Sequence, residues 1–155
     1  MMCGRLASAW PLAIRRATLA DADALAHLTT ELGYPTSGGE IRTRLAELLS
    51  RASQFIAVVD RPEGIVGWVA AEERLLLESG RRAEVVGLVV ASPVRRLGLG
   101  SLLVSAAEEW AQSRGLDTIF VRSNVLRDEA HPFYERLGYR RTKTQHAYIK
   151  RLAPG

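Results

Sequence analysis

Cysteine is almost absent from this chain, since Cys3 is the only one among 155 residues. An internal disulfide and a cysteine-based metal cluster are therefore excluded, and we expect no metal cofactor and a reducing, cytoplasmic compartment. Aromatic residues make up only 6% of the sequence, and no row of them is interleaved with the basic residues, as in nucleic-acid-binding surfaces. No apolar run is long enough to cross a bilayer, and Pro11, Arg15 and Arg16 interrupt any secretory signal. We expect neither nucleic acid nor a membrane as partner.

The remaining composition is that of a globular domain. Hydrophobic residues make up 47% and charged residues 25% of the chain, and a chain of this length can bury one core but hardly two. We expect the domain to span residues 12–152 and residues 1–11 to form a disordered tail. The net charge of +4 suits a small polyanionic ligand as well as a nucleic acid, so charge alone does not choose between them.

Two capping signals open the domain. Thr18 with Asp21 resembles a capping box, and Ser37 with Glu40 matches one. Each precedes apolar residues at helical spacing, which predicts two consecutive helices within residues 18–49.

Short strands flank these two helices. Residues 12–17 read as a strand, and residues 55–59 and 65–71 read as a hairpin because turn residues join them. A polar loop is expected around residues 78–82. The near-continuous apolar run at residues 85–90 predicts a strand that is buried on both faces.

A βαβ unit follows this strand. A helix is predicted from Leu99 to about Gln112, and Gly115 is placed to end it. Residues 119–121 then form a strand that should run parallel to the preceding one, because no tight turn joins the two.

Three further elements complete the chain: a helix at residues 129–137 and closing strands at residues 139–142 and 147–152. The predicted order is β-α-α-β-β-β-α-β-α-β-β. A single three-layer α/β domain with a mixed sheet and about four helices satisfies this order.

The clearest functional signal is the run Arg95-Arg96-Leu97-Gly98-Leu99-Gly100 between the buried strand and a helix. Gly98 and Gly100 let the backbone approach a ligand closely, and N–H groups at a helix N-terminus form an anion site that suits a pyrophosphate. A Rossmann loop would need a third glycine where Leu103 stands, and a P-loop would need Gly-Lys-Ser/Thr. A simple glycine turn with solvated arginines stays open as the alternative.

The motif Arg95-x-x-Gly98-x-Gly100 resembles the Arg/Gln-x-x-Gly-x-Gly/Ala signature of the GNAT acetyltransferases. The segment Tyr134-x-x-x-Gly138-Tyr139 resembles the second signature of that superfamily. The order and spacing of the two segments match, and the two opening helices extend the resemblance over nearly the whole chain. It implies a GNAT fold, whose mixed and mostly antiparallel sheet has splayed parallel central strands, and an N-acetyltransferase with acetyl-CoA as co-substrate.

The resemblance also implies where acetyl-CoA binds. The strands at residues 85–91 and 119–123 part at their C-terminal ends, the pantetheine arm pairs with the backbone there, and the thioester lies near Tyr134. Arg127 stands where many relatives carry Asn, so its contact with CoA is left open. The residues expected to bind acetyl-CoA are Leu88, Val89, Val90, Arg95, Arg96, Leu97, Gly98, Leu99, Gly100, Ser101, Asn124, Arg127 and Tyr134.

Acetyl transfer requires a base for the amine and an acid for the leaving thiolate. Tyr134 is the expected acid, since its helix turns it away from the predicted core face, and a packing tyrosine is the alternative. Glu84 is the expected base, since several family members carry a catalytic carboxylate at this position. The alternatives are a rim carboxylate beside Arg81 and Arg82, a water chain, or His131 as the base.

The acceptor is not specified by a portable motif. We expect the primary amine of a small molecule, because the run from Arg127 to Tyr134 resembles a subset that includes aminoalkylphosphonate and other small-amine acetyltransferases. Arg127 would suit an anionic group on such an acceptor. The alternatives are acetylation of protein or peptide amines, a non-catalytic acetyl-CoA-binding module and a basic nucleic-acid-binding domain. A homodimer is compatible with the sequence.

Overall fold

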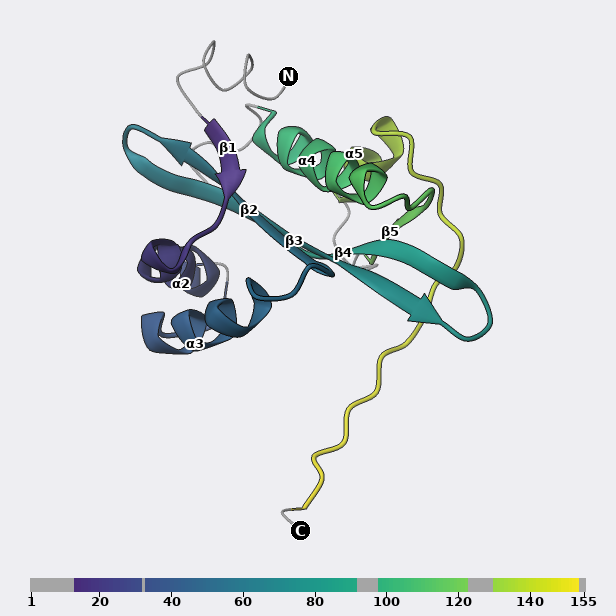
Figure 1. Ribbon diagram of the computed structural model, residues 1–155, viewed down its shortest axis with the longest axis horizontal. Helices are drawn as coiled ribbons and strands as arrows, with labels where there is room; N and C mark the ends of the chain where they lie inside the picture. The colour runs from purple at the N-terminus through teal and green to yellow at the C-terminus, as the bar shows by residue number, and fades with distance from the viewer. Residues whose placement is uncertain (1–12, 32, 92–97, 123–129, 154–155) are drawn as a thin grey trace. The chain divides into compact units, whose positions relative to one another are not determined.

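The computed structural model describes most of the chain in two units. The units are Met1–Arg122 and Ser123–Gly155, and each is described by itself. The first holds a sheet with its helices, and the second holds one described helix, α5 (Ala130–Arg136), as Figure 1 shows. The described residues are 13–31, 33–91, 98–122 and 130–153.

The first unit is built around a five-stranded sheet whose strands follow sequence order. The first three pairings are antiparallel and the last, between β4 and β5, is parallel. This confirms the mixed, mostly antiparallel sheet that the sequence predicts. The strands are β1 (Ala13–Arg16), β2 (Gln54–Arg61), β3 (Gly64–Leu76), β4 (Gly80–Val90) and β5 (Ile119–Val121).

Helices cover both faces of this sheet and give the predicted three layers. The helices α2 (Ala22–Glu31) and α3 (Gly38–Leu48) lie on one face, and α4 (Leu99–Ser113) lies on the other (Figure 1). With α5, the described chain has the four α-helices expected from the sequence. Gly115 ends α4 with a φ of 78°, in the left-handed region that glycine tolerates best.

The strand β2 divides its side chains between two cores. Phe55 and Val59 face α4, where Phe55 stacks on Trp110 with 5.4 Å between the ring centroids. Ile56 and Val58 belong to the other core, beneath α2 and α3. These four side chains are all buried. A central strand that is covered on both faces therefore carries an unbroken apolar run.

Both predicted capping signals are present. Ser37 and Glu40 form the box reciprocally: the Ser37 N–H donates to Glu40 Oε1 at 2.9 Å, and the Glu40 N–H donates to Ser37 Oγ at 3.1 Å. The Thr18 N–H donates to Asp21 Oδ2 at 2.8 Å, where η1 (Leu19–Asp21) leads into α2. These bonds satisfy backbone donors that a helix start leaves without a partner.

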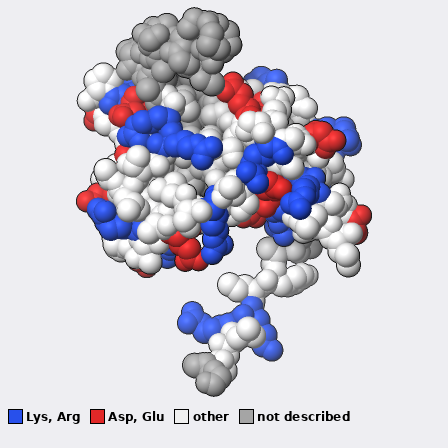
Figure 2. Space-filling view, in the orientation of Figure 1, with Lys and Arg blue, Asp and Glu red and all other residues white. Residues whose placement is uncertain are grey.

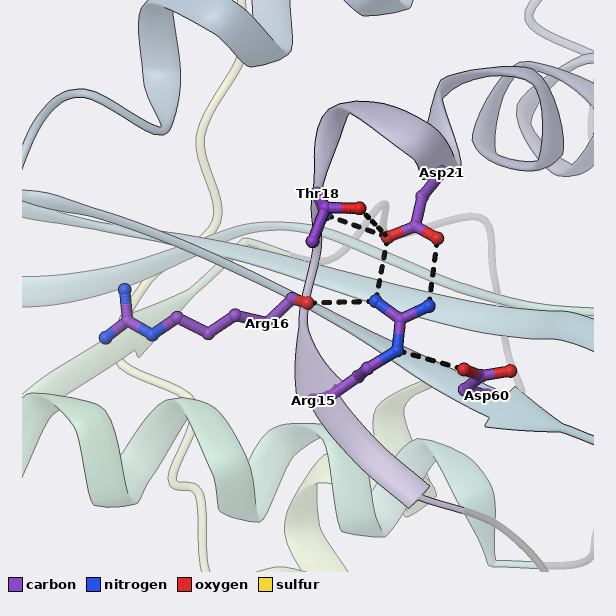
Figure 3. Close-up of polar contacts among 5 residues, drawn as sticks. All are labelled: Arg15, Arg16, Thr18, Asp21 and Asp60. Carbon is purple, nitrogen blue, oxygen red and sulfur yellow. Dashed lines mark hydrogen bonds and ion pairs between the residues drawn. The ribbon is translucent and has the colours of Figure 1, made fainter.

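A partly buried ion pair fixes the entry to α2 against the sheet (Figure 3). Arg15 on β1 donates two hydrogen bonds to Asp21, each 2.9 Å long, and a third of 2.9 Å to Asp60 on β2. Asp21 is only 7% exposed. The hydrogen bonds from Arg15, aided by the Thr18 N–H, hold the pKa of Asp21 below its ordinary value, although burial acts in the opposite direction.

The segment predicted as a polar loop is a β-hairpin instead. Chain reversal is limited to residues 77–79, and Arg81 and Arg82 already belong to β4, which begins at Gly80. The sequence prediction was wrong here because the charged residues of this hairpin pair with one another across the strands. Arg81 bonds Glu73 at 2.8 Å on the neighbouring strand.

The two closing strands predicted from the sequence are not formed. None of the described residues from 139 to 153 is in a strand. Tyr148, Ile149 and Leu152 carry the apolar pattern on which the second prediction rested, and they are 92%, 99% and 79% exposed. Apolar and β-branched residues favour a strand only where a partner edge buries one face.

Candidate active site

The first residues of α4 form a potential anion site. Gly98 caps the helix with φ 81° and ψ 9°, a left-handed conformation that other residues rarely adopt. The first hydrogen bond of the helix runs from the Leu102 N–H to the Gly98 carbonyl at 3.1 Å. The N–H groups of Leu99, Gly100 and Ser101 precede it, so they are the donors that a helix offers to an anion.

One of the predicted contacts at this loop changes in character. Leu99 is 2% exposed and belongs to the core below α4, so only its backbone N–H is suited to bind a ligand. Arg95, Arg96 and Leu97 lie outside the described residues, as do Asn124 and Arg127.

The parallel pairing of β4 with β5 stops before β4 ends. Their parallel ladder joins Ala83 with Ile119 and ends at Val85 with Val121. Beyond this point β4 continues to Val90, and its residues Leu88, Val89 and Val90 pair with β3. In the described part of the chain, the β5 ladder does not reach these three residues, which are the ones predicted to bind pantetheine.

A bulge marks the point where the ladder ends. Ala71 pairs with Val85 and Ala70 pairs with Gly87, so Val86 is an extra residue in β4 and is 53% exposed. The prediction that residues 85–90 are buried on both faces was therefore wrong for Val86, and it holds in full only for Val85, because residues 87–90 are half-buried. Gly87 is required by its neighbour Trp68, because a Cβ would lie 2.7 Å from the indole Cζ3.

Glu84 lies one residue before the end of the ladder and is only 4% exposed. Its Oε1 accepts from Arg74 at 3.3 Å and from Arg82 at 3.4 Å, and its Oε2 pairs with Arg122 at 3.4 Å. The alternative of a rim carboxylate beside Arg81 and Arg82 is therefore only partly right: Arg82 does contact Glu84, but Glu84 is buried and Arg81 pairs with Glu73. Glu84 is instead the shared counter-ion of arginines from β3, from β4 and from the residue after β5.

The family model described as Acetyltransferase (GNAT) family matches residues 22–139. The chain belongs to this family. It is an N-acetyltransferase, and GNAT enzymes use acetyl-CoA. The match runs from the first residue of α2 to Tyr139 and so includes the Gly98 helix start, the β4–β5 pair and Tyr134.

Relatives of this GNAT enzyme include an uncharacterized N-acetyltransferase of Bacillus subtilis, YhdJ. It is 27% identical over 116 residues, which cover 74% of this chain and 79% of that protein. The aminoalkylphosphonate N-acetyltransferase of Salmonella typhimurium is 39% identical over 59 residues, 38% of each chain. An aminoglycoside N-acetyltransferase solved in complex with CoA has a TM-score of 0.81 at 16% identity, covering 91% of this chain and 95% of that one, and shares the fold.

Tyr134 belongs to the second unit and lies on α5. It is half-buried, and its ring makes edge contacts with Phe133 at 5.0 Å and Tyr139 at 5.8 Å between centroids. Gly138 follows the helix with a φ of 93°, in the left-handed region that glycine tolerates best. The side chain of His131, the alternative base, lies outside the described residues.

Proposed function

We propose that this GNAT enzyme transfers the acetyl group of acetyl-CoA to the primary amine of a small molecule. The observation that carries the proposal is the start of α4, where Gly98 exposes three helix N–H groups, together with the end of the β4–β5 ladder at Val85 and Val121. The pyrophosphate would bind these N–H groups, with Arg95 and Arg96 beside it, and the pantetheine arm would pair with residues 88–90 of β4. We take residues 12–152 as the extent of the catalytic domain.

Two relatives support a small acceptor. The Salmonella protein is named for aminoalkylphosphonates, and the structure solved with CoA is named for aminoglycosides. Acetylation of protein or peptide amines, or binding without turnover, stays the alternative. Figure 2 gives no support to a nucleic-acid-binding surface, since basic and acidic groups lie side by side over the face that it draws. In the described part of the chain, no helix is long and apolar enough to cross a membrane.

The reaction places two demands on the chain. An aliphatic amine with a pKa near 10.4 is mostly protonated at neutral pH, so a base must remove a proton before the amine attacks the thioester carbonyl. We assign this role to Glu84, directly or through a water molecule. Its Oε2 is the oxygen suited to the task, because its described partner Arg122 has a side chain that is 68% exposed and is able to move aside.

The second demand is a proton for the thiolate that leaves when the tetrahedral intermediate collapses. We assign this role to Tyr134, because a phenol carries a proton that it can donate. The reference pKa of a tyrosine phenol is near 10. The reference pKa of a thiol is near 8.5, about 1.5 below that of a phenol, so proton transfer from a phenol to a thiolate is only slightly unfavourable. The position of Tyr134 in the second GNAT signature supports the assignment.

The test of this function is release of CoA from acetyl-CoA across a panel of amines. The panel contains amino sugars, polyamines, aminoglycosides, amino acids, aminophosphonates and peptide N-termini. Turnover of small amines above that of peptides is the expected result. Turnover of peptides alone would favour the protein-acetylating alternative, and binding without turnover of any amine would favour a binding module.

Gly98→Val tests the proposed cofactor loop. The side chain should block approach of the pyrophosphate and abolish the rise in melting temperature that acetyl-CoA causes. Gly115→Val is the matched control, because Gly115 has a φ of 78° at the other end of the same helix, and neither glycine has an atom within 4 Å of an added Cβ. The two variants carry the same backbone strain. An equal acetyl-CoA shift in both folded variants would refute the site.

A further inference from the structure

We propose that Arg74, Arg82 and Arg122 bind an anionic group of the acceptor, a carboxylate, phosphate or phosphonate. The inference rests on the proposed acetyltransferase function and names the chemical class of its substrate. The three arginines come from β3, from β4 and from the residue after β5, and they meet around Glu84. Nothing in the local sequence joins them, because 48 positions separate Arg74 from Arg122.

The cluster lies on the face of the sheet that α2 and α3 cover, which is the face of the second core. Glu84 is opposite Glu72 on β3 and Phe120 on β5. Side chains two residues apart on a strand share a face, so Glu72 lies on the same face as Ala70, which packs against that core. This is the face opposite α4. An acceptor bound there would approach the parting strands from the side away from α4, whose N-terminus is proposed to bind the pyrophosphate.

The charges of the cluster are not balanced within it. Three guanidinium groups face the two carboxylates of Glu84 and Glu72, and Glu72 is the more distant, at 3.7 Å from Arg74. The contacts to Glu84 are 3.3–3.4 Å long. These contacts are longer than the 2.6 Å contact between Glu73 on β3 and Arg114 at the end of α4. The cluster therefore has one net positive charge. Because its contacts are long, some guanidinium N–H groups remain able to donate to a ligand.

The guanidinium of Arg82 is held in a fixed orientation and has a donor that a ligand could use. Its guanidinium lies 3.8 Å from the centre of the Phe120 ring, which fixes the plane of its donors. Its Nε is buried and has no hydrogen-bond partner among the described residues. A buried donor without a partner is costly, and an oxyanion bound beside Arg82 would satisfy it. Arg122 is exposed enough to close over the same anion from the solvent side.

The position of the cluster suits an acceptor of a few carbon atoms. Glu84 pairs with Phe120 one step before the β4–β5 ladder ends, and the thioester is proposed to lie between the strands beyond that point. An anion on the arginines therefore leaves the amine of a short molecule close to the reacting carbonyl. Glu84 keeps the three arginines together without ligand and lies beside the ammonium group that must lose a proton.

The kinetic test compares 2-aminoethylphosphonate with ethanolamine, which presents a similar primary amine without the anion. The wild type should show at least a 10-fold higher kcat/KM for the phosphonate. Arg122→Gln should reduce this ratio about 10-fold, as expected for one charge-assisted hydrogen bond. Arg51→Gln is the matched control, since Arg51 is an exposed arginine paired with Glu47 at 2.6 Å, and it should leave the ratio unchanged.

A binding test separates this proposal from the acetyltransferase assignment. Ethylphosphonate has the anion but no amine, and its binding is followed by chemical shifts of the protein without acetyl-CoA. The wild type should bind it and Arg122→Gln should bind it at least 10-fold more weakly. No binding, or an equal loss in Arg51→Gln, would overturn the anion site even if neutral amines are acetylated. Binding without turnover of any amine would instead refute the proposed function and leave the anion site standing.

Discussion

Removal of the Asp21 carboxylate should destabilise the first unit far more than removal of an exposed carboxylate. The Asp21→Asn variant keeps the shape of the side chain but places an amide where two guanidinium N–H groups and the Thr18 N–H now donate. One oxygen cannot replace two, and the amide N–H₂ would point at other donors. The perturbation reaches β1, β2 and the start of α2, because Arg15 also bonds Asp60 (Figure 3).

The expected loss follows from burial. Breaking a fully buried ion pair costs about 3–5 kcal/mol. The side chain of Asp21 is 8% exposed, but that of Arg15 is 36% exposed and regains water, so we expect about 2–3 kcal/mol. For a domain of this size, 1 kcal/mol shifts the melting temperature by about 2–4 °C. The melting temperature of Asp21→Asn should therefore fall by about 4–12 °C at neutral pH.

The effect should depend on pH with a definite sign. The pKa of Asp21 is lowered in the folded chain, and an unperturbed aspartate has a value near 3.9. The ion pair therefore contributes its full stability above about pH 4–5, and the contribution is lost as the pH falls from 3.9 through the lower folded value. The difference in unfolding free energy between wild type and Asp21→Asn should be flat near neutrality and shrink in acid.

The assay is urea unfolding between pH 7 and pH 3, with Glu47→Gln as the control. Glu47 pairs with Arg51 at 2.6 Å, but their side chains are 68% and 53% exposed, so its loss should cost below about 0.5 kcal/mol. Equal losses in Asp21→Asn and Glu47→Gln would refute the reasoning from burial. A difference that grows in acid would refute the assignment of the pH dependence to Asp21.

Two further predictions concern the catalytic groups. Tyr134→Phe should lower kcat by roughly 10- to 1000-fold with little change in acetyl-CoA affinity, as expected for loss of a general acid. The control Tyr148→Phe removes a hydroxyl from an exposed ring and should keep the wild-type kcat. A wild-type kcat in Tyr134→Phe as well would mean that Tyr134 only packs. Glu84→Gln should flatten the acidic limb of the pH profile of kcat/KM, whereas an unchanged profile would point to a water chain or to His131.

The elements that form locally could be predicted from the sequence. The capping box of Ser37 and Glu40 marks the start of α3, and Gly115 marks the end of α4. The parallel pairing of β4 with β5 followed from the absence of a tight turn between them. The Gly98 motif could also be identified, because its chemistry depends on adjacent backbone groups rather than on distant side chains.

The arginine cluster could not be predicted from the sequence. The family resemblance points to Glu84, but nothing near it in the sequence indicates its partners Arg74 and Arg122. They approach Glu84 only through the register of β3 and the parallel pairing of β5, which are long-range properties of the sheet. The residues named as flanking, Arg81 and Arg82, separate in the structure because neighbours along a strand face opposite ways.

The bulge at Val86 explains why the burial of β4 differs from the prediction. In a regular strand, Glu84 and Gly87 would face opposite sides of the sheet, because side chains alternate. The extra residue turns Gly87 back to the side of Glu84, opposite Ala70, where Trp68 packs over it. Burial along β4 therefore follows neither the alternation of a half-exposed strand nor the uniform pattern of a central strand. The bulge lies on β4 between Glu84, which the three arginines contact, and residues 88–90, for which we propose pantetheine binding.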